Sequence, residues 1–124
     1  MQNFEIPSEE IVAWRRHFHE NPELSFKEVA TSQYIVDELG KMPGIDALER
    51  PTETSVVAII KGGKGAGKTI ALRADIDALP VAEANEVCYR SKVEGLSHAC
   101  GHDGHAAMLL GAAKVLAAMK DQFA

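Results

Sequence analysis

The chain has 124 residues, of which 46% are hydrophobic, and its formal net charge at pH 7 is −5. This length and apolar content suffice for one small domain with a buried core, whereas the acidic balance argues against a nucleic-acid or anionic-membrane partner. No stretch reaches the roughly 18 uninterrupted apolar residues of a membrane span, and the first residues lack the basic and apolar regions of a secretory signal. With two cysteines, Cys88 and Cys100, we expect a cytoplasmic protein with reduced thiols.

Two helices are predicted in the first forty residues. Ser8 precedes two acidic residues and an apolar pattern with helical spacing, which predicts a helix that ends at Asn21-Pro22. Residues 25–28, Ser-Phe-Lys-Glu, match a capping box, so a second helix is expected to follow and to end at Gly40. The apolar face of the second helix is predicted to contain Val29, Ala30, Val36 and Leu39.

The rest of the chain predicts two strands and a third helix. Residues 55–60 and 69–74 are short apolar runs between breakers and are expected to be strands, joined by an exposed hairpin loop over 61–68. An irregular polar stretch covers 81–97, and a long amphipathic helix capped by Asp103 follows. Helices that flank a sheet indicate an α/β layer architecture. The apolar face of the last helix is predicted to contain His105, Met108, Leu109, Ala112, Val115, Leu116 and Met119.

One loop has two interpretations. From Gly62 to Thr69 the sequence matches the phosphate-binding loop pattern G-x-x-x-x-G-K-[ST]. In such a loop a helix must begin at the Lys-Thr pair, so that its backbone amides face the phosphates. Here the alternation of Ile70 and Leu72 favours a strand instead. A Gly/Lys-rich hairpin is therefore the preferred interpretation, and a P-loop that binds a nucleotide is the alternative.

Potential metal ligands are most concentrated in residues 97–105, which contain one thiol, three imidazoles and a carboxylate. Cys100 and His102 can turn to the same side of a tight segment flanked by glycine, where a thiolate and a neutral imidazole suit a divalent metal. Asp75 and Asp77 end an apolar run with strand spacing. Because the pattern is not a zinc finger, it predicts part of a catalytic metal site that draws other ligands from elsewhere. The alternative is a small buried cysteine beside histidines at a helix terminus.

Three segments in order, 15–26 (RRHFHENPELSF), 71–80 (ALRADIDALP) and 98–105 (HACGHDGH), resemble three blocks of one protein family. It is the amidohydrolase branch of the aminoacylase/carboxypeptidase metallopeptidases. This branch includes hippurate hydrolases, N-acyl-amino-acid amidohydrolases and plant indole-acetyl-amino-acid hydrolases. The resemblance covers nearly the whole chain with the expected spacing.

The resemblance implies a fold and cofactors. The chain is expected to be the amino-terminal part of a three-layer α/β/α metallopeptidase catalytic domain, incomplete in this chain, with residues 1–124 all in that domain. The carboxyl-terminal part and an inserted smaller domain, which often serves dimerisation, are expected to be absent. The intact enzyme would hold two divalent ions, Zn, Mn, Co or Ni, and would form a homodimer.

The resemblance also implies roles for individual residues. Cys100 and His102 correspond to metal ligands, and Asp77 to the carboxylate that orients a ligand or assists the site. Asp75 falls where other branches carry a ligand histidine. Two further motif residues are not assigned as ligands, namely Asp103 and His105. Three residues of the first block are interpreted as fixing the first helix against the sheet: Arg15, His17 and His19.

The implied reaction is hydrolysis of the amide bond of N-acyl amino acids such as hippurate, or of small peptide-like substrates. In the family a Glu-Glu pair that holds the general base and two more histidine ligands lie beyond the long helix, whereas no Glu or His follows His105 here. We therefore expect a fragment with negligible amidase activity and weak metal affinity on its own. The alternative is a non-enzymatic metal-binding or interaction fragment.

Overall fold

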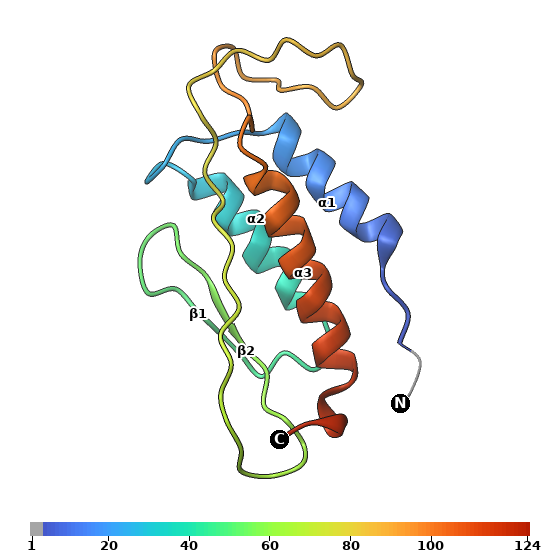
Figure 1. Ribbon diagram of the computed structural model, residues 1–124. Coiled ribbons are helices and arrows are strands. Elements are labelled where there is room, and N and C mark those ends of the chain that lie inside the picture. Colours follow the sequence, from blue (N-terminus) through green and yellow to red (C-terminus); the bar gives the residue numbers. More distant parts are fainter. Residues whose placement is uncertain (1–3) are drawn as a thin grey trace.

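The computed structural model describes residues 4–124, which form helices packed together with a small sheet (Figure 1). The two strands pair antiparallel, with Leu48 opposite Ala58. Both of these residues pack against the helical core, and the predicted α/β class is confirmed. The elements are α1 (Ser8–Glu20), α2 (Val29–Gly40), β1 (Ala47–Glu49), β2 (Val57–Ile59), α3 (His102–Ala118) and a short 3-10 helix (Lys120–Gln122).

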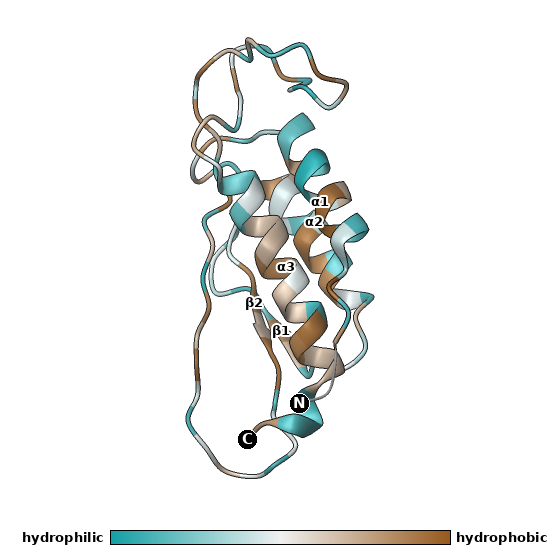
Figure 2. Cartoon of the chain, turned by 45° about the vertical axis from the view of Figure 1, so that its right-hand side comes forward, coloured by the Kyte–Doolittle hydropathy of each residue, from teal (hydrophilic) through white to brown (hydrophobic). Residues whose placement is uncertain are grey.

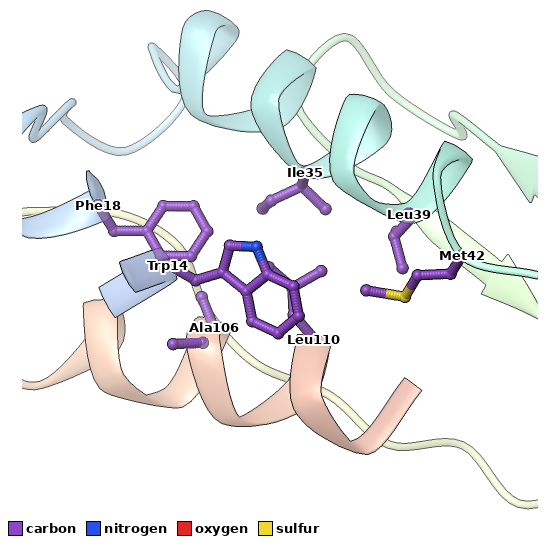
Figure 3. Packing of buried hydrophobic residues seen from close by; sticks show 8 residues of the cluster. Trp14, Phe18, Ile35, Leu39, Met42, Ala106 and Leu110 are labelled. Atoms are coloured by element: carbon purple, nitrogen blue, oxygen red, sulfur yellow. The ribbon is translucent and has the colours of Figure 1, made fainter. Parts of the chain in front are cut away.

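The core lies between the three helices, with the single tryptophan at its centre. Trp14 and Phe18 are one turn apart on α1 and are 5% and 2% exposed. Figure 3 shows the indole of Trp14 between side chains of α2, including Leu39, and side chains of α3, including Leu110. Helix α1 ends before Asn21-Pro22, as predicted, because proline disfavours the helical conformation in the residue before it.

The predicted capping box of the second helix is wrong. Helix α2 begins at Val29, and the side chain of Ser25 does not cap it. Phe26, with a φ of 65°, has the left-handed conformation and cannot belong to the helix. Instead a carboxylate outside the helix, that of Glu23, accepts hydrogen bonds from the backbone N–H and the hydroxyl of Thr31, both at 2.6 Å. It therefore satisfies a free backbone donor of the first turn.

The predicted apolar faces of two helices also differ from the observed ones. On α2 Leu39 is buried as predicted, but Val29 is exposed and Ile35 takes part in the core. On α3 the buried residues are mainly small, whereas two of the predicted ones, His105 and Met108, are exposed and the other five are only partly buried. Small side chains let α1 approach closely, since a Cβ on Gly111 would lie 2.6 Å from the Cδ1 of Ile11. The buried apolar positions of α3 are Ala106, Ala107, Leu110, Gly111 and Ala117.

The predicted strand over 69–74 is not formed. Residues 57–59 do form a strand, but it pairs with β1, an element that the sequence did not indicate. The segment after β2 is extended and carries hydrophobic residues (Figures 1 and 2), yet Ile70 and Leu72 are 81% and 58% exposed. A strand needs a neighbour for its N–H and C=O groups, and this segment has none among residues 4–124.

The loop over 61–68 is consequently not a hairpin between paired strands. Its backbone N–H groups at Gly63 and Lys64 donate to the carbonyls of Lys120 and Phe123, at 2.8 and 3.0 Å. No helix begins at Lys68-Thr69, so the structure does not support the P-loop alternative. Within the described part of the chain, no helix has the length and apolarity needed to span a bilayer.

Candidate metal centre

The structure brings together Asp77 and His102, two of the residues singled out in the sequence. The Nδ1 of His102 lies 2.8 Å from the carboxylate Oδ1 of Asp77 and 3.1 Å from its backbone carbonyl. Both atoms of Asp77 are acceptors, so the Nδ1–H of the ring donates to them. The proton is thereby held on Nδ1, which leaves the lone pair of Nε2 free. A histidine prepared in this way is the usual form of a metal ligand.

Backbone hydrogen bonds hold Asp77 in this position. The N–H of Ala78 donates to the carbonyl of Glu23, and the N–H of Leu79 to that of Ser97, at 2.8 and 2.9 Å. These bonds belong to isolated bridges outside the sheet. They join the second block of the family resemblance to the first block and to Ser97, the residue before the third, and they fix the segment around Asp77 beside the turn that leads into α3.

The turn before α3 carries the cysteine of the motif. Cys100 is exposed and has a free thiol. Gly101 follows with a φ of 92°, a conformation that glycine takes at little cost, and helix α3 begins at His102 without a side-chain cap. Asp75 does not join the Asp77–His102 pair. It forms an ion pair with the exposed Arg73, at 2.7 Å.

His98 is a buried imidazole without hydrogen bonds. It is 7% exposed, and neither ring nitrogen has a partner among residues 4–124. Burial lowers the pKa of His98 below 6.5, against the opposing charge of Asp103, so the ring is neutral at pH 7. Buried polar atoms in native proteins are almost always paired, with protein, water or a bound ion. The ring of His98 therefore carries two buried polar atoms for which the described residues supply no partner.

A second cluster of hydrogen-bonded side chains includes Asp103, the residue after His102. The sequence did not predict this cluster. Asp103 was predicted to cap α3, but it lies inside the first turn and is 2% exposed. Its Oδ2 accepts hydrogen bonds from Arg15 Nε at 2.9 Å and from His19 Nδ1 at 2.7 Å. The Nε2 of His19 lies 2.7 Å from Glu83 Oε1. Arg15 and His19 therefore fix α1 against α3 rather than against the sheet.

One signal in the sequence could have revealed this cluster. Arg15 and His19 are four residues apart and share one face of α1. A cation and an imidazole on the buried side of a helix need carboxylate partners. The identity of those partners, Asp103 and Glu83, could not be read locally because they are 84 and 64 positions away from His19.

The cluster lowers the pKa of both carboxyl groups. Burial raises the pKa of Asp103, but the hydrogen bonds from His19 and from the Gly104 backbone and the charge of Arg15 outweigh it, so the pKa lies below 3.8. The hydrogen bond from His19 lowers the pKa of Glu83 below 4.5 against the opposing effect of burial. Both groups are therefore ionised at pH 7.

We expect acid to destabilise the fold in two steps. Burial lowers the pKa of His17 from 6.5, so the unfolded chain binds more protons below that pH and stability starts to fall there. The carboxyls of Asp103 and Glu83 stabilise the fold above their ordinary pKa values of 3.8 and 4.5, and this contribution is lost as the pH falls through their lower folded values. Urea denaturation at a series of pH values measures this; greater stability in acid would contradict it.

The donor set fits a divalent ion in part. Among residues 4–124 there is no group of three or more His, Cys, Asp or Glu side chains that could hold a metal. Cys100 and His102 offer one exposed thiol and one ring nitrogen with a free lone pair, which are ligand types that suit zinc and related ions. These two residues would hold the ion, with Asp77 orienting His102, and further ligands would have to come from outside the described residues.

Comparison with known proteins agrees with these motifs. Residues 71–124 match the model of peptidase family M20/M25/M40. The chain is 48% identical over 112 residues to an N-acyl-L-amino acid amidohydrolase of Geobacillus stearothermophilus, covering 90% of this chain and 30% of the relative. It is 54% identical over 112 residues to thermostable carboxypeptidase 2 of Saccharolobus solfataricus, covering 90% and 28%.

Among solved structures, the Bacillus subtilis YXEP protein, described as a dinuclear metal binding peptidase from the M20 family, superposes with a TM-score of 0.85. It is 44% identical, and the match covers 90% of this chain and 31% of that protein. The resemblance predicted from the three blocks is thus confirmed, and the chain is similar to hydrolases of peptidase family M20/M25/M40. It spans about 30% of the length of these relatives.

Proposed function

We propose that this chain supplies part of the metal centre of an amidohydrolase that cleaves the amide bond of N-acyl amino acids. The observation that carries the proposal is the 2.8 Å hydrogen bond between Asp77 and His102, which follows the exposed Cys100 by two residues in the sequence. The similarity to an N-acyl-L-amino acid amidohydrolase supports the substrate class. Hippurate is the model substrate for this class.

In the proposed reaction the residues of this chain bind and orient. A divalent ion, when bound, polarises the amide carbonyl and supplies a nucleophile near neutral pH. Cys100 and His102 would hold the ion, and the hydrogen bond to Asp77 keeps the proton of His102 on Nδ1, which leaves Nε2 as the ring nitrogen available to a metal. The general base and the remaining ligands lie outside residues 1–124, and the chain alone therefore has negligible amidase activity.

The setting of the protein is part of the same proposal. Two free, exposed cysteines fit a reducing compartment, and we place the protein in the cytoplasm. Two ions in the intact enzyme are supported by the dinuclear metal binding described for the YXEP protein. Residues 1–124 would form the amino-terminal segment of the catalytic domain, and the intact enzyme would be a homodimer without nucleic-acid or membrane partners.

Metal titration of single-residue variants tests the site. Co²⁺ added to the purified chain should give a visible spectrum with thiolate character, because a thiolate and an imidazole both bind it. We expect Cys100→Ala and His102→Ala each to abolish this spectrum, and Asp77→Ala to lower the affinity about 10- to 100-fold. His105→Ala is the matched control, because His105 is exposed one turn further along α3.

Two outcomes would contradict the proposal. Co²⁺ binding that survives in both Cys100→Ala and His102→Ala would place the metal elsewhere. Rapid hydrolysis of hippurate by the chain alone, lost in Cys100→Ala, would show that the general base does not have to come from outside it. Folding of each variant is checked by far-UV circular dichroism, so that loss of binding is not confused with loss of structure.

A further inference from the structure

The ring of His19 lies between two carboxylates in the interior of the protein. Its Nδ1 is 2.7 Å from Asp103 Oδ2, and its Nε2 is 2.7 Å from Glu83 Oε1. The side chains of His19, Asp103 and Glu83 are only 6%, 3% and 7% exposed. Each ring nitrogen of His19 therefore lies within hydrogen-bonding distance of a carboxylate oxygen, one from α3 and one from the irregular segment.

Every side chain of this cluster has a partner within it. Arg15 and His19 both contact Asp103, and His19 also contacts Glu83. Tyr89 covers the cluster, with its ring edge-on to His19 at 5.6 Å between centroids and 5.1 Å from the guanidinium carbon of Arg15. Charges that are buried, paired and hydrogen-bonded in this way hold a defined geometry, because each lost bond would leave an uncompensated charge.

The cluster joins three parts of the chain. His19 is in the last turn of α1, Asp103 in the first turn of α3, and Glu83 in the irregular segment between them. The first turn of α3 has no side-chain cap, and Gly101 before it has no side chain that would restrict the backbone conformation. The position of this turn therefore depends on the bonds that its side chains make. Asp103 bonds to Arg15 and His19 on α1, whereas its neighbour His102 bonds to Asp77.

We propose that His19 is a positioning residue for the metal-binding turn. By holding Asp103 against α1, it keeps the adjacent His102 in hydrogen-bonding distance of Asp77, so that Nε2 stays the nitrogen available to a metal. His19 does not touch the metal or the substrate. The inference rests on the proposed function, since it assigns His102 as a ligand.

Two readouts of His19→Gln test the inference. Glutamine fills similar space but cannot contact both carboxylates along opposite directions as the ring does, so we expect the Co²⁺ affinity to fall about 10- to 100-fold. Without metal, ¹⁵N-resolved NMR of the imidazole of His102 should show a proton fixed on Nδ1 in the wild type. In His19→Gln we expect a mixture of the two tautomers. A role limited to stability would change neither readout in a folded variant.

The matched control is His17→Gln, on the same helix. His17 stacks on Tyr34 at 3.6 Å between ring centroids, away from α3, so its replacement should leave both readouts unchanged. Where His19→Gln does not fold by circular dichroism, Glu83→Gln replaces it. This variant weakens the contact between His19 and the irregular segment and changes no residue of α1 or α3. It should lower the Co²⁺ affinity and mix the tautomers of His102, as His19→Gln does.

The outcomes separate this inference from the proposed function. A folded His19→Gln with the Co²⁺ affinity and His102 signals of the wild type would overturn the role of His19. Co²⁺ binding that is independent of Cys100 and His102 would overturn the proposed metal site. In that case the metal-free signals of His102 still decide whether His19 controls the hydrogen bond between His102 and Asp77.

Discussion

Replacing Trp14 by alanine is expected to lower the free energy of unfolding by about 3–5 kcal/mol. The indole is 5% exposed and lies between α2 and α3 at the centre of the core (Figure 3). Truncation would remove its apolar contacts and leave a cavity that the three helices cannot close without moving apart. Urea denaturation followed by far-UV circular dichroism measures the loss, because the variant has no tryptophan fluorescence.

Val12→Ala provides the control for this prediction. Val12 lies on the same helix and is 50% exposed, so its truncation should cost no more than about 0.5 kcal/mol. If Trp14→Ala is largely unfolded in buffer, Trp14→Phe replaces it. Phenylalanine fills more of the cavity, so this variant should be folded enough for its free energy of unfolding to be measured. Equal unfolding midpoints for Trp14→Ala and Val12→Ala would show that the helices do not pack around Trp14.

Asp103→Ala is expected to cost a similar amount, about 3–5 kcal/mol, for an electrostatic reason. The substitution removes the acceptor of Arg15 and His19 from a site where Asp103 is 2% exposed. It would leave the buried ring of His19 with one partner and the guanidinium of Arg15 with none in the cluster. The fluorescence of Trp14 reports the unfolding transition, since this is the only tryptophan of the chain.

A surface ion pair between the same two helices is the matched control. Glu10 on α1 pairs with Lys114 on α3, and both side chains are at least 40% exposed. Glu10→Ala should therefore cost at most about 1 kcal/mol. Asp103→Asn, which retains one carbonyl acceptor, should fall between the two. A loss for Asp103→Ala no larger than that for Glu10→Ala would mean that the buried cluster does not stabilise the fold.

Several features were predicted from the sequence because they depend on near neighbours. The end of α1 follows from Asn21-Pro22, and the end of α2 at Gly40 follows from the helix-breaking character of glycine. Residue type and motif also singled out Asp77 and His102 as candidate site residues. Their direct hydrogen bond was not predicted, because 25 positions separate them in the chain.

The wrong predictions share a different cause. Apolar periodicity placed Met108 on the buried face of α3, but α1 packs on the small residues around Gly111. Residues 69–74 have the composition of a strand, but a strand also needs a neighbour to pair with. Asp103 has the residue type of a helix cap, yet Arg15 and His19 on α1 bind it inside the protein. In each case the outcome depended on which segment, distant in sequence, packs against or pairs with the residue.

The sequence by itself determined where helices form, and its three motif blocks indicated the family and the residues suited to a metal. Such properties depend on residue type and on contacts within one or two turns of the chain. Only the tertiary structure decided which faces are buried, that Asp77 holds His102, and that His19 is enclosed by Asp103 and Glu83. Those contacts join segments that are 25 to 84 positions apart, so they exist only after the helices have packed together.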